Sequence, residues 1–142
     1  MNILTKGIVF IAATTLVSVP AFAGQKRPQP VAVDLVAKTA IGDMITARNS
    51  RNRNVYIGCG TRNVEDGSGG LFNWAFCQAE DADTDTVLCT TTNPELVKTI
   101  REINDASFIT FSWTDDGTGV LTCSSMGFST QSFYLLKKRR SR

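Results

Sequence analysis

An acidic run between the second and third cysteines carries Asp81, Asp83 and Asp85 at alternate positions. This spacing matches the first three ligand positions of an EF-hand-type loop, in which carboxylate oxygens bind calcium. The match ends there, because Thr86 stands where the loop needs glycine and Thr92 stands where a bidentate glutamate should close the shell. The aspartates are therefore weak calcium candidates, and we interpret the run as a polar turn that needs no metal or other cofactor.

The chain has four cysteines and no histidine. No two cysteines have C-x-x-C spacing, and the commonest zinc ligand is missing, so a redox or zinc site is disfavoured. In an exported chain of this size, an even number of cysteines indicates disulfides. If the acidic turn centres near Asp83, its flanking cysteines lie opposite each other, which favours Cys77–Cys89 with Cys59–Cys123. The alternative pairing, Cys59–Cys77 with Cys89–Cys123, also joins plausible neighbouring strands and stays open.

Catalytic arrangements are poorly supported by the residue types. Without histidine, the chain cannot build a Ser-His-Asp or Cys-His centre or a histidine-based metal hydrolase site. The glycine-rich segment 67–70 lacks the Lys-Ser/Thr pair of a phosphate-binding loop. Glu95 and Glu102 would lie on one side of a helix, but about 10 Å apart along its axis, which suits solvated charges better than an acid and base pair. We expect a protein that is not an enzyme.

The first residues predict the compartment. Lys6 precedes an apolar run over residues 7–19, and Ala21-Phe22-Ala23 follows as a cleavage signal. Residues 1–23 are therefore predicted to be a secretory signal peptide, since the run is well short of the roughly 20 residues that a membrane-spanning helix needs. No later stretch is apolar enough to span a bilayer. We expect a soluble protein that is secreted or periplasmic.

Charge is distributed unevenly along the chain. Residues 54–136 hold three basic and eleven acidic side chains, whereas residues 24–53 hold six basic and two acidic ones. The C-terminal residues 137–142 form a basic tail without apolar residues, which predicts disorder and a possible contact with an anionic surface. An interleaved basic and aromatic pattern is absent, so specific nucleic-acid binding is not expected. The candidate anion contacts are Lys137, Lys138, Arg139, Arg140 and Arg142.

Hydrophobic residues in the body of the chain recur mostly with period two, which is typical of β-strands. The segment from residue 69 to 80 alternates aromatic residues on one face with small residues on the other. A second strand near residue 110 also aligns aromatic residues on one face. We expect the aromatic faces of both strands to form the core, and the residues concerned are Phe72, Trp74, Phe76, Phe111 and Trp113.

One helix is predicted over residues 94–104, because Asn93 can cap it and proline occupies its first position. Residues 42–50 are predicted to be a strand that forms a hairpin with the next strand. Residues 24–40 form a poorly defined leader segment that could be a strand or a helix, and residues 41–136 form a single β-rich domain. The predicted fold is mainly β: a disulfide-stabilised antiparallel β-sandwich or barrel with one short helix.

Several short segments occur in an order that is known from other proteins. From Thr46 to Leu135 the chain carries TARNS, YIGC, WAFC, VLCTTTNPEL, DASFITFSW, TC and SFY. This series resembles a family of small exported bacterial proteins that has no assigned function. The resemblance implies a shared β-rich scaffold and carries over no catalytic residue, and the basic tail is not part of the pattern.

The sequence therefore favours an exported, non-catalytic binding or interaction protein. Its ligand is unidentified and could be a protein, a polysaccharide or an anionic surface. A secreted enzyme inhibitor is an alternative, with a rigid loop at 65–70 or 81–85 that protrudes. A structural subunit of an extracellular filament or matrix is another, in which residues 25–40 add a strand to a neighbouring copy.

Overall fold

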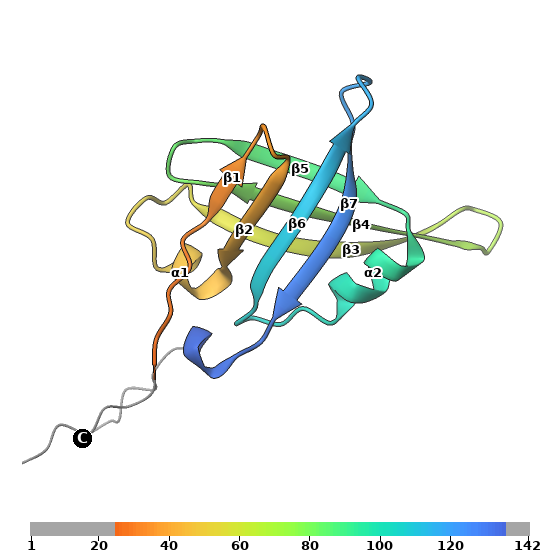
Figure 1. Ribbon diagram of the computed structural model, residues 1–142. Coiled ribbons are helices and arrows are strands. Elements are labelled where there is room, and N and C mark those ends of the chain that lie inside the picture. Colours follow the sequence, from red (N-terminus) through yellow and green to blue (C-terminus); the bar gives the residue numbers. More distant parts are fainter. Residues whose placement is uncertain (1–24, 136–142) are drawn as a thin grey trace, which may run out of the picture.

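The computed structural model describes residues 25–135 (Figure 1). The predicted signal peptide and basic tail lie outside these residues. Seven strands form one sheet in the order β1-β2-β6-β7-β5-β4-β3. In chain order the elements are β1 (Ala32–Asp34), β2 (Thr39–Asp43), α1 (Met44–Arg48), β3 (Tyr56–Glu65), β4 (Leu71–Glu80), β5 (Thr86–Thr91), α2 (Pro94–Arg101), β6 (Phe108–Asp115), β7 (Leu121–Ser129) and a short 3₁₀ turn, η1 (Ser132–Tyr134).

The sheet is strongly twisted, so that β3, β4 and β5 cross behind β2, β6 and β7 (Figure 1). Neighbouring strands are antiparallel except for β5 and β7, which are parallel where Thr90 lies opposite Thr122. The inner faces of both halves contribute to one core, and α2 adds Val97 and Ile100 to it. The mainly β prediction is confirmed. Within residues 25–135 the edge strands β1 and β3 do not pair, so the sheet is not closed into a barrel.

Part of the predicted leader segment belongs to the sheet, because residues 32–40 include β1 and the first two residues of β2. The predicted strand over 42–50 is wrong beyond Asp43, because α1 begins at Met44, and the described chain therefore has two α-helices rather than one. The Asp43 side chain explains why a helix replaces the predicted strand here. It is buried and accepts hydrogen bonds from the Thr46 backbone N–H (2.6 Å), as a helix cap, and from the Gln29 backbone N–H (2.7 Å).

Helix α2 forms where the sequence predicts it. The Asn93 side chain accepts hydrogen bonds from the backbone N–H groups of Glu95 and Leu96, and proline occupies the first turn. The helix ends at Arg101, three residues before the predicted end. Its buried stripe packs against β3, β4 and β7, so α2 covers the inner face of the sheet.

The aromatic residues of β6 lie in the core, as predicted. Phe111 is 1% exposed, and Trp113 and Ile109 are also buried. The ring centroids of Phe111 and Trp113 are 6.1 Å apart, in a tilted arrangement that is favourable for aromatic pairs. These side chains occupy much of the space between the two halves of the sheet.

Strand β4 faces the opposite way from the prediction. Phe72 is 52% exposed, and Trp74 and Phe76 lie half-buried on the outer face, whereas the alternate residues of the strand point inward. The prediction failed because large residues of β6 already fill the core, which leaves room only for small residues opposite them. Those inward residues are fully buried: Ala75, Cys77 and Ala79.

The disulfides join Cys59 to Cys77 and Cys89 to Cys123, so the favoured pairing is wrong and the alternative is formed. Cys77 lies directly opposite both Cys59 and Cys89, because β4 is the middle strand of its half of the sheet. Cys123 lies on β7, which is the neighbour of β5 rather than of β3. Cys89 and Cys123 therefore meet across one pair of strands, and Cys77 is left for Cys59.

Candidate functional site

Most of the exposed large hydrophobic residues within the strands lie on the outer face of β3, β4 and β5. Directly opposite residues of an antiparallel pair lie on the same face, and the register places Val64 opposite Phe72 and Arg62 opposite Trp74. Leu88 of β5 lies opposite Gln78 on this same side. We call this surface the aromatic face and define it by Arg62, Val64, Phe72, Trp74, Phe76 and Leu88.

The rings of the aromatic face contact one another and a cation. The Trp74 and Phe76 ring centroids are 5.8 Å apart with an angle of 47° between the planes. The Arg62 guanidinium carbon lies 4.9 Å from the Phe76 ring centroid, which is a cation–π contact. Gly60 lies opposite Phe76, and a Cβ at this position would come within 3.0 Å of the ring. Glycine therefore allows the Phe76 ring to lie against the backbone of β3.

Apolar exposure increases toward the end of the β3–β4 hairpin, which extends beyond the body of the molecule (Figure 1). Val64 and Phe72 are about half exposed on the outer side, and Leu71 is 69% exposed next to the turn. Apolar side chains that stay exposed in this way gain little free energy from folding. A contiguous exposed apolar patch indicates a binding surface.

One carboxylate organises the tip of this hairpin. Asp66 accepts hydrogen bonds from the Ser68 hydroxyl (2.7 Å) and from the backbone N–H groups of Ser68 (2.9 Å) and Gly70 (3.0 Å). These hydrogen bonds, the one from the Ser68 hydroxyl above all, lower the pKa of Asp66 below its ordinary value. Gly67 and Gly69 have φ angles of 79° and 88°, a region that favours glycine. The tip therefore has a defined shape.

The acidic run forms the turn between β4 and β5, and its first aspartate, Asp81, binds backbone groups. Asp81 accepts hydrogen bonds from the backbone N–H groups of Val33 (3.0 Å), Asp83 (3.0 Å) and Asp85 (3.1 Å). The Asp81 carboxylate thus ties the turn to the edge strand β1. No group of three or more potential ligand side chains that could hold a metal ion is found within residues 25–135.

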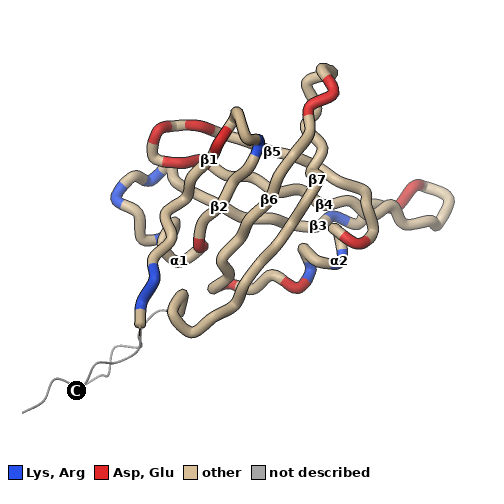
Figure 2. Tube along the Cα trace, in the orientation of Figure 1, with Lys and Arg blue, Asp and Glu red and all other residues tan. Residues whose placement is uncertain are grey.

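Acidic and basic residues occupy different parts of the chain trace (Figure 2). Acidic residues gather at the hairpin tips and at the β4–β5 turn, and basic residues surround α1 and the loop that follows it. Arg62 adds a positive charge to the aromatic face. The candidate anion contacts of residues 137–142 lie outside the described residues.

Sequence reasoning missed the aromatic face, although one signal for it was present. Cys77 alternates with Trp74 and Phe76 along β4, and a disulfide-bonded cysteine is among the most consistently buried residues. Because Cys77 lies on the opposite face of β4 from the aromatic residues, its burial indicates that those residues face outward. The contributions of Arg62, Val64 and Leu88 depend on the register between strands, which no local pattern gives.

No protein-family model, curated protein or solved structure matches the chain. None of the helices formed by residues 25–135 is long and apolar enough to cross a membrane. The arrangement of the aromatic face is therefore the observation from which function can be argued.

Proposed function

We propose that this chain is an exported, non-catalytic binding protein that recognises a protein partner through its aromatic face. The observation that carries the proposal is the outward orientation of Phe72, Trp74 and Phe76, with Arg62 beside them. Burial of this face on a partner would remove apolar area from water at about 25 cal/mol per Å². The predicted signal peptide supports export, and two disulfides fit an oxidising compartment.

A protein partner fits this surface better than a polysaccharide does. Tryptophan and arginine are the residue types that most often dominate protein–protein binding energy, and phenylalanine is enriched in interface cores. The rings of Trp74 and Phe76 are tilted by 47°, so they do not form the flat platform on which a sugar chain stacks. The hairpin also protrudes, which suits insertion into a groove of a folded protein (Figure 1).

Site-specific photo-cross-linking tests the proposal in the organism that produces the protein. A benzophenone side chain at position 72 should give a discrete cross-linked protein product. The matched control is position 114, where Thr114 is exposed on the outer face of β6. The product should then bind the purified wild-type chain, and the double variant Phe72→Ala/Trp74→Ala should bind about 30-fold more weakly or worse, as expected from loss of about 2 kcal/mol at a hot spot.

Two results would refute the proposal. One is equal cross-linking from positions 72 and 114. The other is a purified product that binds the double variant as tightly as it binds the wild type. The melting temperature of each variant must be measured alongside, so that a folding defect is not mistaken for a binding defect.

A secreted enzyme inhibitor is a second candidate, and the shape of the β3–β4 hairpin favours it. An inhibitor needs a rigid segment that enters an active-site cleft, and the tip is protruding and held by Asp66. Inhibition of a panel of secreted hydrolases is the test. Leu71→Ala should weaken inhibition, whereas Val120→Ala, at the corresponding end of the β6–β7 hairpin, should not.

A further inference from the structure

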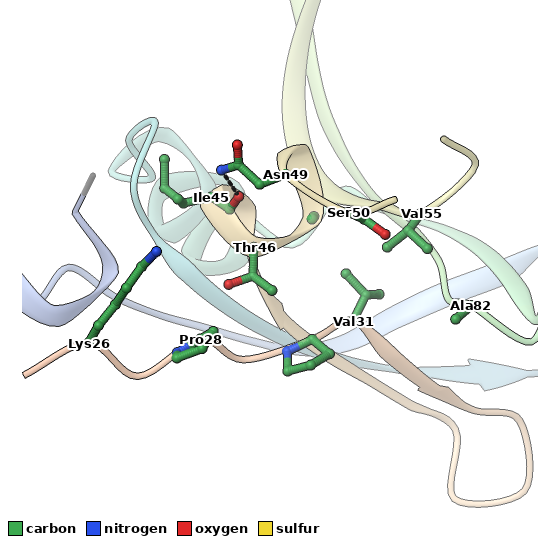
Figure 3. Close-up of a pocket in the computed structure, with 11 residues that line it drawn as sticks. Lys26, Pro28, Val31, Ile45, Thr46, Asn49, Ser50, Val55 and Ala82 are labelled. Atoms are coloured by element: carbon green, nitrogen blue, oxygen red, sulfur yellow. Dashed lines mark hydrogen bonds between the residues drawn. The ribbon is translucent and has the colours of Figure 1, made fainter. Parts of the chain in front are cut away.

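Two clefts adjoin helix α1, away from the aromatic face. The first cleft lies between helix α1 and the segment before β1, and its volume is about 320 Å³ (Figure 3). Its walls are mostly apolar and include Pro28, Val31, Ile45 and Val55, with Lys26 at one end. Ligand sites in proteins are typically concave, mostly apolar and of roughly 300–1,000 Å³. The first cleft has these properties.

The second cleft also borders α1 and has a volume of about 620 Å³. It shares Ile45, Ala47, Ser50 and Val55 with the first cleft, so the two hollows adjoin around the helix. Its lining is more polar than that of the first cleft. The added polar residues are Arg48, Asn52, Arg53, Tyr56 and Asp105.

Positive charge dominates the lining of the two clefts. Lys26, Arg48 and Arg53 line them, and Asp105 is the one acidic residue among the lining residues. Figure 2 shows basic residues along α1 and its following loop, on the side of the molecule opposite the β3–β4 hairpin. Two arginines on one polar cleft favour an anion, since guanidinium groups donate charge-assisted hydrogen bonds to carboxylates and phosphates.

The walls of the first cleft are held in place by the chain itself. The Gln29 backbone N–H donates to the Asp43 carboxylate (2.7 Å), and the Asp43 N–H donates to the Gln29 carbonyl (2.9 Å). Asp43 also caps α1. The segment before β1 and the helix are therefore fixed to each other through one buried carboxylate, so the cleft is formed before any ligand arrives.

We propose that the two clefts together bind a small amphiphile with an anionic head group. The alkyl chain lies in the apolar cleft between Pro28 and Val55, and the head group binds Arg48 and Arg53 in the adjoining polar cleft. Carboxylate and phosphate head groups share the chemistry that the arginines recognise, so the experiment includes both. This inference concerns a different surface from the aromatic face and does not depend on the proposed function.

Isothermal titration calorimetry of the mature chain provides the test, with probes kept below their micelle concentrations. Dodecanoate and dodecyl phosphate carry both the chain and the charge and should bind. Dodecanol lacks the charge, inorganic phosphate lacks the chain, and dodecyltrimethylammonium reverses the charge, so each should bind at least about tenfold more weakly. Stronger binding of either anionic amphiphile shows which head group is preferred.

Matched variants locate the site. Arg48→Gln/Arg53→Gln should weaken binding of the better anionic probe about tenfold or more, because two charge-assisted contacts are lost. The control Lys98→Gln/Arg101→Gln also removes two positive charges, but from α2, which does not line either cleft. It should leave binding unchanged. Ser50→Phe, which fills space shared by both clefts, should abolish binding while the melting temperature shows that the fold persists.

The proposal is overturned if dodecanol binds as tightly as dodecanoate, because the arginines would then contribute nothing. It is equally overturned if inorganic phosphate alone matches dodecyl phosphate, or if the α1 and α2 double variants lose affinity to the same extent. If Ser50→Phe unfolds the chain, Thr46→Phe at the wall of the first cleft replaces it, and undiminished binding by a folded variant refutes the location.

Discussion

Strands β4 and β6 have similar sequence patterns and opposite orientations. Each alternates aromatic residues with smaller ones, but β6 buries Phe111 and Trp113 and presents serine and threonine outward, whereas β4 buries alanine and cysteine and presents Phe72, Trp74 and Phe76 outward. On the outer face of β6 and β7, Ser112 hydrogen-bonds to serines of β7. One outer face is polar, and the other carries exposed apolar side chains.

The turns of the two hairpins make the contrast sharper. Residues 65–69 and 115–119 follow the same pattern of two acidic residues, glycine, serine or threonine, and glycine, and their glycines have similar positive φ angles. The hairpins therefore begin from the same local chemistry. The aromatic residues of the two hairpins point in opposite directions because the rings of β6 occupy the core space that the rings of β4 would need.

Core truncation should produce the largest difference between the two strands. Phe111→Ala should lower the free energy of unfolding by about 3–5 kcal/mol, because it removes a fully buried ring. Trp74→Ala should cost only about 1–2 kcal/mol, because Trp74 lies partly exposed on the outer face and loses less buried area. Urea denaturation of both variants measures these values, and equal losses would mean that the contrast between the strands is wrong.

The disulfides fix which face of β4 points inward, and they can be removed one at a time. Cys89→Ala/Cys123→Ala should cost about 4 kcal/mol and Cys59→Ala/Cys77→Ala about 3 kcal/mol, because sequence separations of 34 and 18 constrain the unfolded chain to different extents. Peptide mapping of the unreduced protein checks the pairing directly. A fragment that links Cys77 to Cys89 would contradict it.

Acid should loosen the two hairpin tips by a small amount. Hydrogen bonds from the side chains and backbone of Ser68 and Thr118 lower the pKa values of Asp66 and Asp116, respectively. Because each folded pKa lies below the unfolded value of about 3.9, the carboxylates stabilise their turns above that pH. This stabilisation is lost as the pH falls through the lower folded pKa.

NMR titration of the Ser68 and Thr118 amide signals follows both tips in one experiment. Asp66→Asn should abolish the transition at Ser68 and leave the one at Thr118 unchanged. Midpoints at or above the ordinary aspartate value would show that the hydrogen bonds do not hold the tips.

Local signals in the sequence were sufficient for several elements. Helix α2 follows from Asn93 and Pro94, the acidic turn follows from residues 81–85, and the buried face of β6 follows from its alternation. Each of these features is decided by residues close together in the chain. Propensity, capping and period therefore suffice to predict them.

Other features depend on distant residues and could not be read locally. Helix α1 forms because Asp43 caps it while binding Gln29, and the disulfide pairing follows from the placement of β7 beside β5. The aromatic face was partly predictable from local signals and partly dependent on distant residues. Both faces of β4 carry apolar residues, so alternation alone does not show which face points inward. Cys77 was the residue that indicated the inner face.

Tryptophan fluorescence tests the orientation of β4 most directly, because the chain has two tryptophans and one lies on each strand. Trp113→Phe leaves only Trp74, and Trp74→Phe leaves only Trp113. We expect Trp74 to emit at longer wavelength and to be quenched by iodide several times more strongly than Trp113, which is buried in the core. Equal quenching, or stronger quenching of Trp113, would contradict the outward aromatic face.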